Sequence, residues 1–275
     1  MSDDVTHRAR DVESRLADLK AYHIESIATV NYGDDNWPLL CARTKRWEAS
    51  RPTVLITGGV HGDEPAGVHA ALAFLADGQR ELHDAFQFIV FPCLNPSGLD
   101  AHTLETQSGV NLNRLFGIGS TQPEVRAVED WLQLHPVRFL MTFDLHEVRP
   151  DYVGEGFLER DNPRGAYLYE TVTDNSERIG RAMIDALPSR LPVCDWPMIY
   201  DDINRAGVIS YPEGLRNAIY SKGTALDAFL VRRYTAHSFT LETPTGWSLR
   251  DRVDAHLTFL RTALRHTVRL SVSKR

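Results

Sequence analysis

Short, almost continuously apolar runs recur along this chain and are separated by segments with a helical period. The runs lie near 53–57, 87–93, 138–145 and 238–242, and the helical patterns near 65–76, 123–134, 174–187 and 223–233. Strands that are apolar throughout occur in sheets covered on both faces, and their alternation with helices is typical of βαβ units. The pattern predicts an α/β fold with a sheet packed between helices.

Nothing in the sequence divides the 275 residues into separate units. There is no repeat, no low-complexity stretch and no Pro/Gly/Ser-rich linker, so we expect a single domain over 1–275, with about 1–20 as an N-terminal helical extension. A last helix is expected from about Leu249 to Val268, with its apolar positions against the sheet. The segment 147–173 is rich in Gly, Pro, Asp and Tyr and is predicted to be a long surface loop.

Composition excludes several classes of partner. The formal charge is −7 and the basic residues are scattered, so nucleic acid is not expected as a partner. The first residues are acidic and lack an apolar segment, and no later run is long enough for a membrane span, which predicts a cytoplasmic protein without a membrane partner. Cys41, Cys93 and Cys194 form no CxxC pair and are expected to be buried, reduced thiols.

Metal-binding residue types stand where the predicted strands end. His61 and Glu64 follow the run at 53–57, and His146 closes the run that begins at Phe139. Because ligands gather at the carboxyl ends of strands in such sheets, we expect these side chains to converge. Two nitrogens and one carboxylate suit a single Zn²⁺ per chain, with one coordination position open for water.

Each half of this pattern also has an ordinary explanation. His61 and Glu64, three apart before a helix that Pro65 would begin, match a spacing that occurs by chance in many chains. A lone histidine at a strand end, such as His146, can be a core residue hydrogen-bonded to the backbone. Asp144 and Glu147 flank His146, however, and a carboxylate that reaches a ligand imidazole would fix its tautomer.

Further motifs follow in a specific order. Asn95-Pro96-Ser97-Gly98 precedes Gly109-Val110-Asn111-Leu112-Asn113-Arg114, and the segments 218–227 and 234–242 contain Ala-Ile-Tyr, an apolar residue followed by Asp227, and Ser-Phe-Thr-Leu-Glu. With the HxxE motif and Asp-Leu-His, this order resembles the zinc carboxypeptidases of the carboxypeptidase A type. In a shortened form it also resembles their aspartoacylase and succinylglutamate desuccinylase branch. The resemblance runs from about 53 to 246.

The resemblance implies a fold, a cofactor and a set of roles. The fold would be a single-domain, mixed, largely parallel twisted sheet with helices on both faces. Zinc would be bound by His61, Glu64 and His146, and Glu242 would be the general base that takes a proton from the attacking water and returns it to the leaving amine. The substrate's terminal carboxylate would be recognised by Asn113 and Arg114, and Tyr220 would cap the site.

The chain departs from the family pattern at three positions. Leu104 stands where an arginine that stabilises the oxyanion is expected, Asn111 replaces a usual acidic residue, and Leu115 replaces a frequent asparagine. Loss of an oxyanion donor costs on the order of 100-fold in rate, so either another residue substitutes or the substrate differs. The candidates for that substitution are Arg149, Arg160 and His102.

One position bears on side-chain specificity. Leu226, just before Asp227, resembles the residue at the floor of the pocket that receives the terminal side chain. An apolar residue at that floor would favour an apolar or aromatic terminal residue in the substrate.

Three functions follow from the sequence. The first is a zinc-dependent metallocarboxypeptidase that hydrolyses a C-terminal peptide or peptide-like amide bond, and the second is an N-acyl amino acid amidohydrolase of the aspartoacylase type. In both, the substrate is a peptide or acyl amino acid with a free carboxylate. The third is a domain that binds zinc or a peptide without catalysis, which the presence of Glu242 argues against. The sequence leaves the oligomeric state open.

Overall fold

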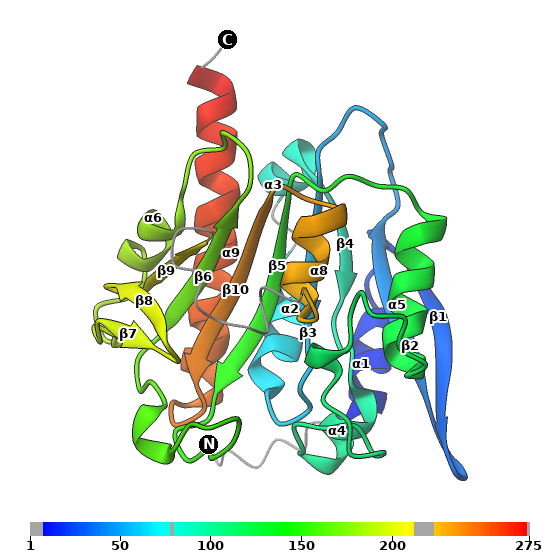
Figure 1. Ribbon diagram of the computed structural model, residues 1–275. Coiled ribbons are helices and arrows are strands. Elements are labelled where there is room, and N and C mark those ends of the chain that lie inside the picture. Colours follow the sequence, from blue (N-terminus) through cyan, green and yellow to red (C-terminus); the bar gives the residue numbers. More distant parts are fainter. Residues whose placement is uncertain (1–7, 78–79, 212–222, 274–275) are drawn as a thin grey trace.

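The computed structural model describes residues 8–77, 80–211 and 223–273, which contain a ten-stranded sheet in the order β1-β2-β4-β3-β5-β10-β6-β9-β8-β7. Figure 1 shows the sheet with the long C-terminal helix α9 behind it. The strands are β1 Tyr22–Tyr32, β2 Asp35–Thr44, β3 Thr53–Gly58, β4 Gln87–Phe91, β5 Met141–Val148, β6 Tyr167–Val172, β7 Met198–Ile199, β8 Asp202–Arg205, β9 Val208–Tyr211 and β10 His237–Pro244.

The centre of the sheet is parallel and its flanks are mostly antiparallel. Strands β4, β3, β5 and β10 pair in parallel, as do β6 and β9. Antiparallel pairs join β1 to β2, β2 to β4, β6 to β10, β7 to β8 and β8 to β9. The prediction of a mixed α/β sheet is confirmed.

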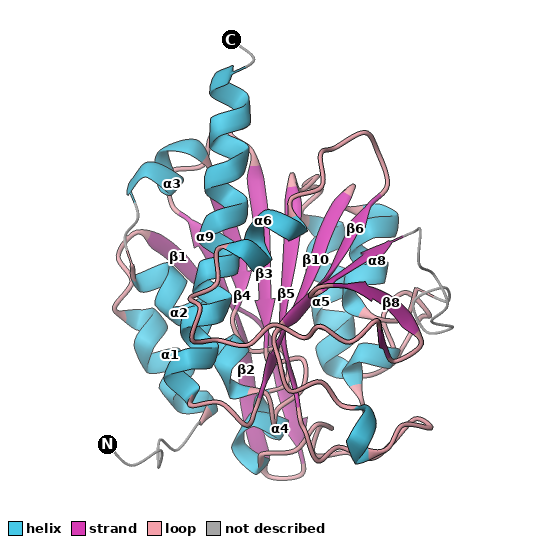
Figure 2. Cartoon of the chain, turned by 90° about the vertical axis from the view of Figure 1, so that its left-hand side faces the viewer, coloured by secondary structure: helices cyan, strands magenta, loops and turns pink. Residues whose placement is uncertain are grey.

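Helices cover both faces of this sheet (Figure 2). One face carries α1 Ala9–Ala17, α2 Pro65–Ala76, α6 Gly180–Asp185 and α9 Leu249–Ser273, and the other carries α5 Pro123–Leu134 and α8 Leu226–Arg233. Shorter helices are α3 Arg80–Ala85, α4 Pro96–Ala101 and the 3₁₀ turns Leu112–Arg114 and Glu159–Asp161. Among the described helices, none is long and apolar enough to cross a membrane.

The continuous apolar runs are explained by two separate cores. In β3, Val54 and Ile56 pack under α2 and α9, while Leu55 packs with α5 and α8 on the opposite face. Successive residues of a strand point to opposite faces, so a strand covered on both sides has no polar alternation. This arrangement accounts for the strands that the sequence predicts at 53–57, 87–93, 138–145 and 238–242.

Other predicted elements need correction. Segment 147–173 is not one long loop, because its last residues form β6, and the helix expected at 174–187 is limited to Gly180–Asp185. The helix α1 lies within the expected N-terminal extension, where Val12 and Leu16 are buried in the core. The single-domain extent over 1–275 stays a prediction.

Candidate metal and active site

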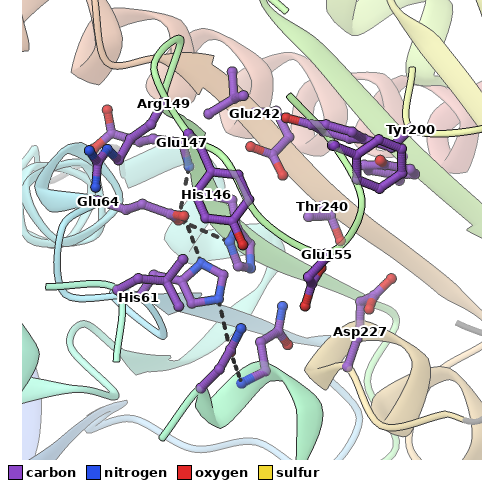
Figure 3. Close-up of a pocket in the computed structure, with 18 of the residues that line it drawn as sticks. His61, Glu64, His146, Glu147, Arg149, Glu155, Tyr200, Asp227, Thr240 and Glu242 are labelled. Carbon is purple, nitrogen blue, oxygen red and sulfur yellow. Dashed lines mark hydrogen bonds and ion pairs between the residues drawn. The ribbon is translucent and has the colours of Figure 1, made fainter. Parts of the chain in front are cut away.

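Three buried side chains meet where β3 and β5 end. His61 lies on the turn after β3, Glu64 immediately precedes α2, and His146 lies in β5. Glu64 stands between the two imidazoles (Figure 3), with its Oε1 2.6 Å from His61 Nδ1 and its Oε2 2.9 Å from His146 Nδ1. One potential ligand atom from each residue lies within 4.8 Å of the other two, a grouping that could hold a metal ion.

A hydrogen-bond acceptor lies at Nε2 of each imidazole and fixes the orientation of the ring. His61 Nε2 lies 3.2 Å from Asn111 Oδ1, and His146 Nε2 lies 2.9 Å from Asp144 Oδ2. Asp144 is itself fixed, since Thr57 Oγ1 donates to its Oδ1 at 2.7 Å. An acceptor at Nε2 favours a proton there and turns the Nδ1 lone pair toward the centre of the cluster. The donor set and its orientation therefore fit a divalent metal such as zinc.

Close backbone packing holds the loop that carries His61 and Glu64. A Cβ on Gly62 would lie 1.9 Å from the carbonyl carbon of Gly98, so only glycine lets this loop rest against α4. At the start of α2, Pro65 has no N–H to leave unsatisfied. The contact between Gly62 and Gly98 holds the HxxE and NPxG segments against each other.

The charged groups of the cluster shift one another's pKa values. Burial alone would raise the pKa of Glu64, but the His61 and His146 imidazoles hold that pKa well below its usual range. Burial would lower the pKa of His146, yet the carboxylates of Asp144 and Glu64 raise it well above its usual value. A metal would replace protons at this position, so metal binding is expected to release them.

Glu242 faces this cluster from the neighbouring strand. In the parallel pairing of β10 with β5, Glu242 lies opposite His146, and in the pairing with β6 it lies opposite Tyr167. Its Oε2 is buried and has no hydrogen-bond partner among the described residues. Burial raises the pKa of Glu242 to about 8, His146 opposes the shift, and nearby carboxylates such as Glu64 add to it.

The two residues expected to bind a carboxylate lie at the 3₁₀ turn Leu112–Arg114. Asn113 is buried and its Oδ1 accepts a hydrogen bond from Leu226 N at 2.8 Å, which leaves its amide NH₂ as the group it could offer a ligand. Arg114 forms a two-pronged ion pair with Glu155, with Nε–Oε1 2.9 Å and Nη2–Oε2 2.7 Å. Tyr220 lies outside the described residues.

These groups share one cavity of about 430 Å³. His61, Glu64, His146, Glu242, Asn113 and Arg114 all line it. Sequence reasoning gave no role to many of the other wall residues, most of which are aromatic or polar; they include Tyr152, Phe157, Tyr167, Tyr169, Tyr200, Tyr211, Asp227, Thr240 and Glu155.

Leu226 is not part of this wall, which corrects the expectation that it forms an apolar floor. Its side chain is fully buried in the apolar core beside Phe116 and Phe229, and Ala225 and Asp227 line the cavity instead. The helix α8 begins at Leu226, and successive residues of a helix point in different directions. The Leu226 side chain therefore enters the core, while that of Asp227 faces the cavity. Burial raises the pKa of Asp227 to about 6.

Strand register explains why the wall is polar here. Thr240 of β10 lies opposite Asp144 of β5 and Tyr169 of β6, two residues before Glu242, and residues two apart share a face. The same periodicity in the sequence, Thr240 with Glu242 and Asp144 with His146, is the signal that could have identified Thr240. No such periodicity marks the tyrosines of β6 and β9, because the sequence pattern does not predict these two strands.

The three candidate replacements for the missing arginine lie in different places. Arg149 lines the cavity, where its Nη1 lies 3.1 Å from Asp63 Oδ2. Arg160 is largely exposed, and His102 ends α4 in a left-handed conformation; neither is among the residues that line the cavity. Leu104 does line the cavity. Of the three candidates, only Arg149 is placed to reach a bound ligand.

Comparison with known proteins gives matches in sequence and in structure. Residues 50–148 match the family model described as "Succinylglutamate desuccinylase/Aspartoacylase catalytic domain". A curated relative, Carboxypeptidase SOL1 of Arabidopsis thaliana, is 24% identical over 163 residues, which is 53% of this chain and 32% of that protein. The match thus spans about a third of the length of the curated relative.

Solved structures share the whole fold at low identity. A candidate metallopeptidase from Shewanella amazonensis superimposes with a TM-score of 0.73 at 22% identity, covering 94% of this chain and 92% of the other. Carboxypeptidase A from Helicoverpa armigera gives a TM-score of 0.66 at 15% identity, covering 100% and 76%. The chain has the fold of the metallocarboxypeptidases, as its motifs predict.

Proposed function

We propose that this protein is a metal-dependent hydrolase, specifically a zinc metallocarboxypeptidase that removes the C-terminal residue of a peptide or peptide-like amide. The observation that carries the proposal is the register of β10 with β5. That register sets the unpartnered carboxylate oxygen of Glu242 beside the cluster of His61, Glu64 and His146. A buried carboxylate oxygen with no hydrogen-bond partner is costly, and a role in proton transfer gives a reason for its position.

The chain's own residues supply most of the chemistry. His61, Glu64 and His146 would hold the metal, which when bound polarises a carbonyl group and favours deprotonation of water. Glu242 takes the proton of the attacking water on Oε2 while the oxygen adds to the amide carbon. As the C–N bond breaks, Glu242 gives that proton to the leaving nitrogen. One proton is thus taken up and returned in each cycle.

Substrate orientation falls to the 3₁₀ turn at the edge of the cavity. Arg114 can donate two parallel N–H···O bonds to a terminal carboxylate, and the amide of Asn113 lies next to it. The aromatic wall offers Tyr169 and Tyr211, whose rings stack with centroids 5.7 Å apart, as a surface for the terminal side chain. Arg149, which also lines the cavity, is our candidate for stabilising the oxyanion.

A second candidate function is an N-acyl amino acid amidohydrolase. It is favoured by the match of residues 50–148 to the succinylglutamate desuccinylase and aspartoacylase family model. The same metal ligands, carboxylate-binding pair and general base would serve, since both reactions cleave an amide next to a free carboxylate. The two functions differ in the size of the acyl part of the substrate that the cavity must hold.

A paired assay separates these functions. Zinc-loaded protein is incubated with N-blocked dipeptides and with N-acyl amino acids, with and without a chelator, and release of free amino acid is measured. Chelator-sensitive cleavage of dipeptides supports the carboxypeptidase, and cleavage of acyl amino acids alone supports the amidohydrolase. Bound zinc without either cleavage would contradict both and leave a binding role.

A further inference from the structure

The guanidinium of Arg114, which we propose binds the substrate's carboxylate, is paired in the structure with a carboxylate of the chain itself. Glu155 contacts Arg114 with both of its oxygens, at 2.9 and 2.7 Å, and both side chains line the active-site cavity. This is the geometry with which arginine binds a free carboxylate. The Nε and Nη2 donors of Arg114 cannot serve Glu155 and a substrate carboxylate at the same time.

The backbone that presents Glu155 is unusual for this residue. Gly154 and Phe157 form a two-way backbone hydrogen-bonded bridge, and Glu155 and Gly156 are the two turn residues between them, with φ of +53° and +91°. Both positions of such a turn favour Gly, Asn or Asp, because a larger L-residue is strained at positive φ. A glutamate in this strained conformation is therefore a candidate for a functional residue.

The turn at 154–157 is fastened at its base and lightly held at its tip. At the base, Asn162 Nδ2 donates to the carbonyl of Tyr152 at 2.7 Å, and the ring of Phe157 meets that of Tyr200 edge-on at 4.8 Å. Near the tip, Val153 is 64% exposed and the Glu155 side chain 39% exposed. No side chain of residues 153–157 is fully buried, so release of Glu155 from Arg114 would not require core side chains to move.

A simple surface ion pair is the alternative explanation for this contact. Half-exposed pairs of this kind contribute little stability, so stability gives a weak reason for a strained glutamate to be there. The same weakness makes the pair easy to replace by another carboxylate. The position inside the cavity, and not the strength of the pair, distinguishes it from Arg181–Asp185, an exposed arginine–carboxylate pair elsewhere on the surface.

We propose that Glu155 is an internal competitor for the carboxylate-binding site of Arg114, so that a substrate binds by exchanging its carboxylate for that of Glu155. Glu155 thereby sets both the affinity for carboxylate-bearing ligands and the charge of the empty site. The proposal rests on the proposed function only through the role of Arg114. It concerns binding and requires no turnover.

The test measures binding in a protein that cannot turn over. In zinc-loaded Glu242→Gln protein, titration calorimetry compares N-acetyl-phenylalanine with its carboxamide, with and without the further change Glu155→Gln. We expect Glu155→Gln to tighten binding of the carboxylate about twofold to fivefold, because a weak competing pair is removed, and to leave binding of the carboxamide unchanged.

Three further variants control this comparison. Glu155→Gly removes the carboxylate and also relieves the strained turn, and it should give the same gain. Asp185→Asn removes the acid of the Arg181 pair outside the cavity and should give none. Adding Arg114→Gln to Glu155→Gln should abolish the gain.

Two results would overturn the proposal. Unchanged or weaker carboxylate binding in both Glu155 variants would show that Glu155 does not compete. Absence of carboxylate binding in every variant would remove Arg114 as the receptor. If the variants bind as expected but unaltered, zinc-loaded protein hydrolyses neither dipeptides nor acyl amino acids, the proposed function is contradicted and the competition stands.

Discussion

Glu242 and His146 lie opposite each other on adjacent parallel strands, with their side chains on the same face of the sheet. Strand register alone therefore brings the proposed base beside a proposed metal ligand. No loop has to fold to place these two residues side by side, since both belong to neighbouring central strands of the sheet.

Metal binding should stabilise the folded protein. The three ligand residues come from two separate parts of the chain, 61–64 and 146, and the site is not expected to exist in the unfolded chain. At zinc concentrations of about 100 times Kd, the free energy of unfolding should rise by about 2.7 kcal/mol. Thermal unfolding with zinc and with chelator measures this. A Glu64→Ala variant should show a much smaller difference, and an equal difference would contradict the site.

Asn111 should tune metal affinity. Its Oδ1 lies 3.2 Å from His61 Nε2 and is a neutral acceptor. A carboxylate there would make the imidazole more basic, so Asn111→Asp should raise zinc affinity and Asn111→Ala lower it, each by on the order of tenfold. Competition with a chromophoric chelator reads out Kd directly. The exposed Asn31→Asp serves as control, and a matching change in that variant would indicate a general charge effect.

Leu226 should matter for stability and not for selectivity. Its side chain is fully buried in the core between the sheet, α5 and α8. We expect Leu226→Ala to lower the free energy of unfolding by about 2 to 5 kcal/mol while the order of preferred substrates stays the same. Denaturant unfolding and a substrate panel test both parts. A changed preference at unchanged stability would return Leu226 to the cavity wall.

His256 should make stability depend on pH. Burial, followed by the nearby charges of His146 and Arg252, lowers the pKa of this fully buried residue to about 3, against an ordinary value of 6.5. Below pH 6.5 the unfolded chain binds a proton that the folded chain does not. The free energy of unfolding therefore falls from pH 6.5 toward pH 3, by at most about 1.4 kcal/mol per unit from this residue.

The variant His256→Gln isolates this contribution. Because glutamine does not titrate, the slope of unfolding free energy against pH, measured in chelator between pH 6.5 and 4.5, should be smaller by close to one proton. Equal slopes in the two proteins would mean that His256 is protonated in the folded state.

The sequence could predict the central strands and the residues at their ends. Runs such as 53–57 are apolar on both faces of the strand, and this signal is strong and local. His61, Glu64, His146 and Glu242 follow from those strand ends, because parallel strands present their carboxyl ends together.

The rest depended on information that the sequence does not display locally. Strands β1 and β2 have mixed, partly exposed faces, and the Gly33-Asp34 turn between them was the available signal. Glu155 comes to the cavity through a two-residue turn in a segment without periodicity. Leu226 and Asp227 are neighbours, and only the exact start of α8 decides which one faces the cavity.

The most direct test of the proposed mechanism is the turnover of zinc-loaded Glu242→Gln protein relative to the unaltered protein, with bound zinc measured in both. We predict equal zinc content and a fall in turnover of about 100-fold to 10,000-fold, because the amide cannot carry the proton between water and amine. Turnover that is unchanged at equal zinc content would contradict the role of Glu242.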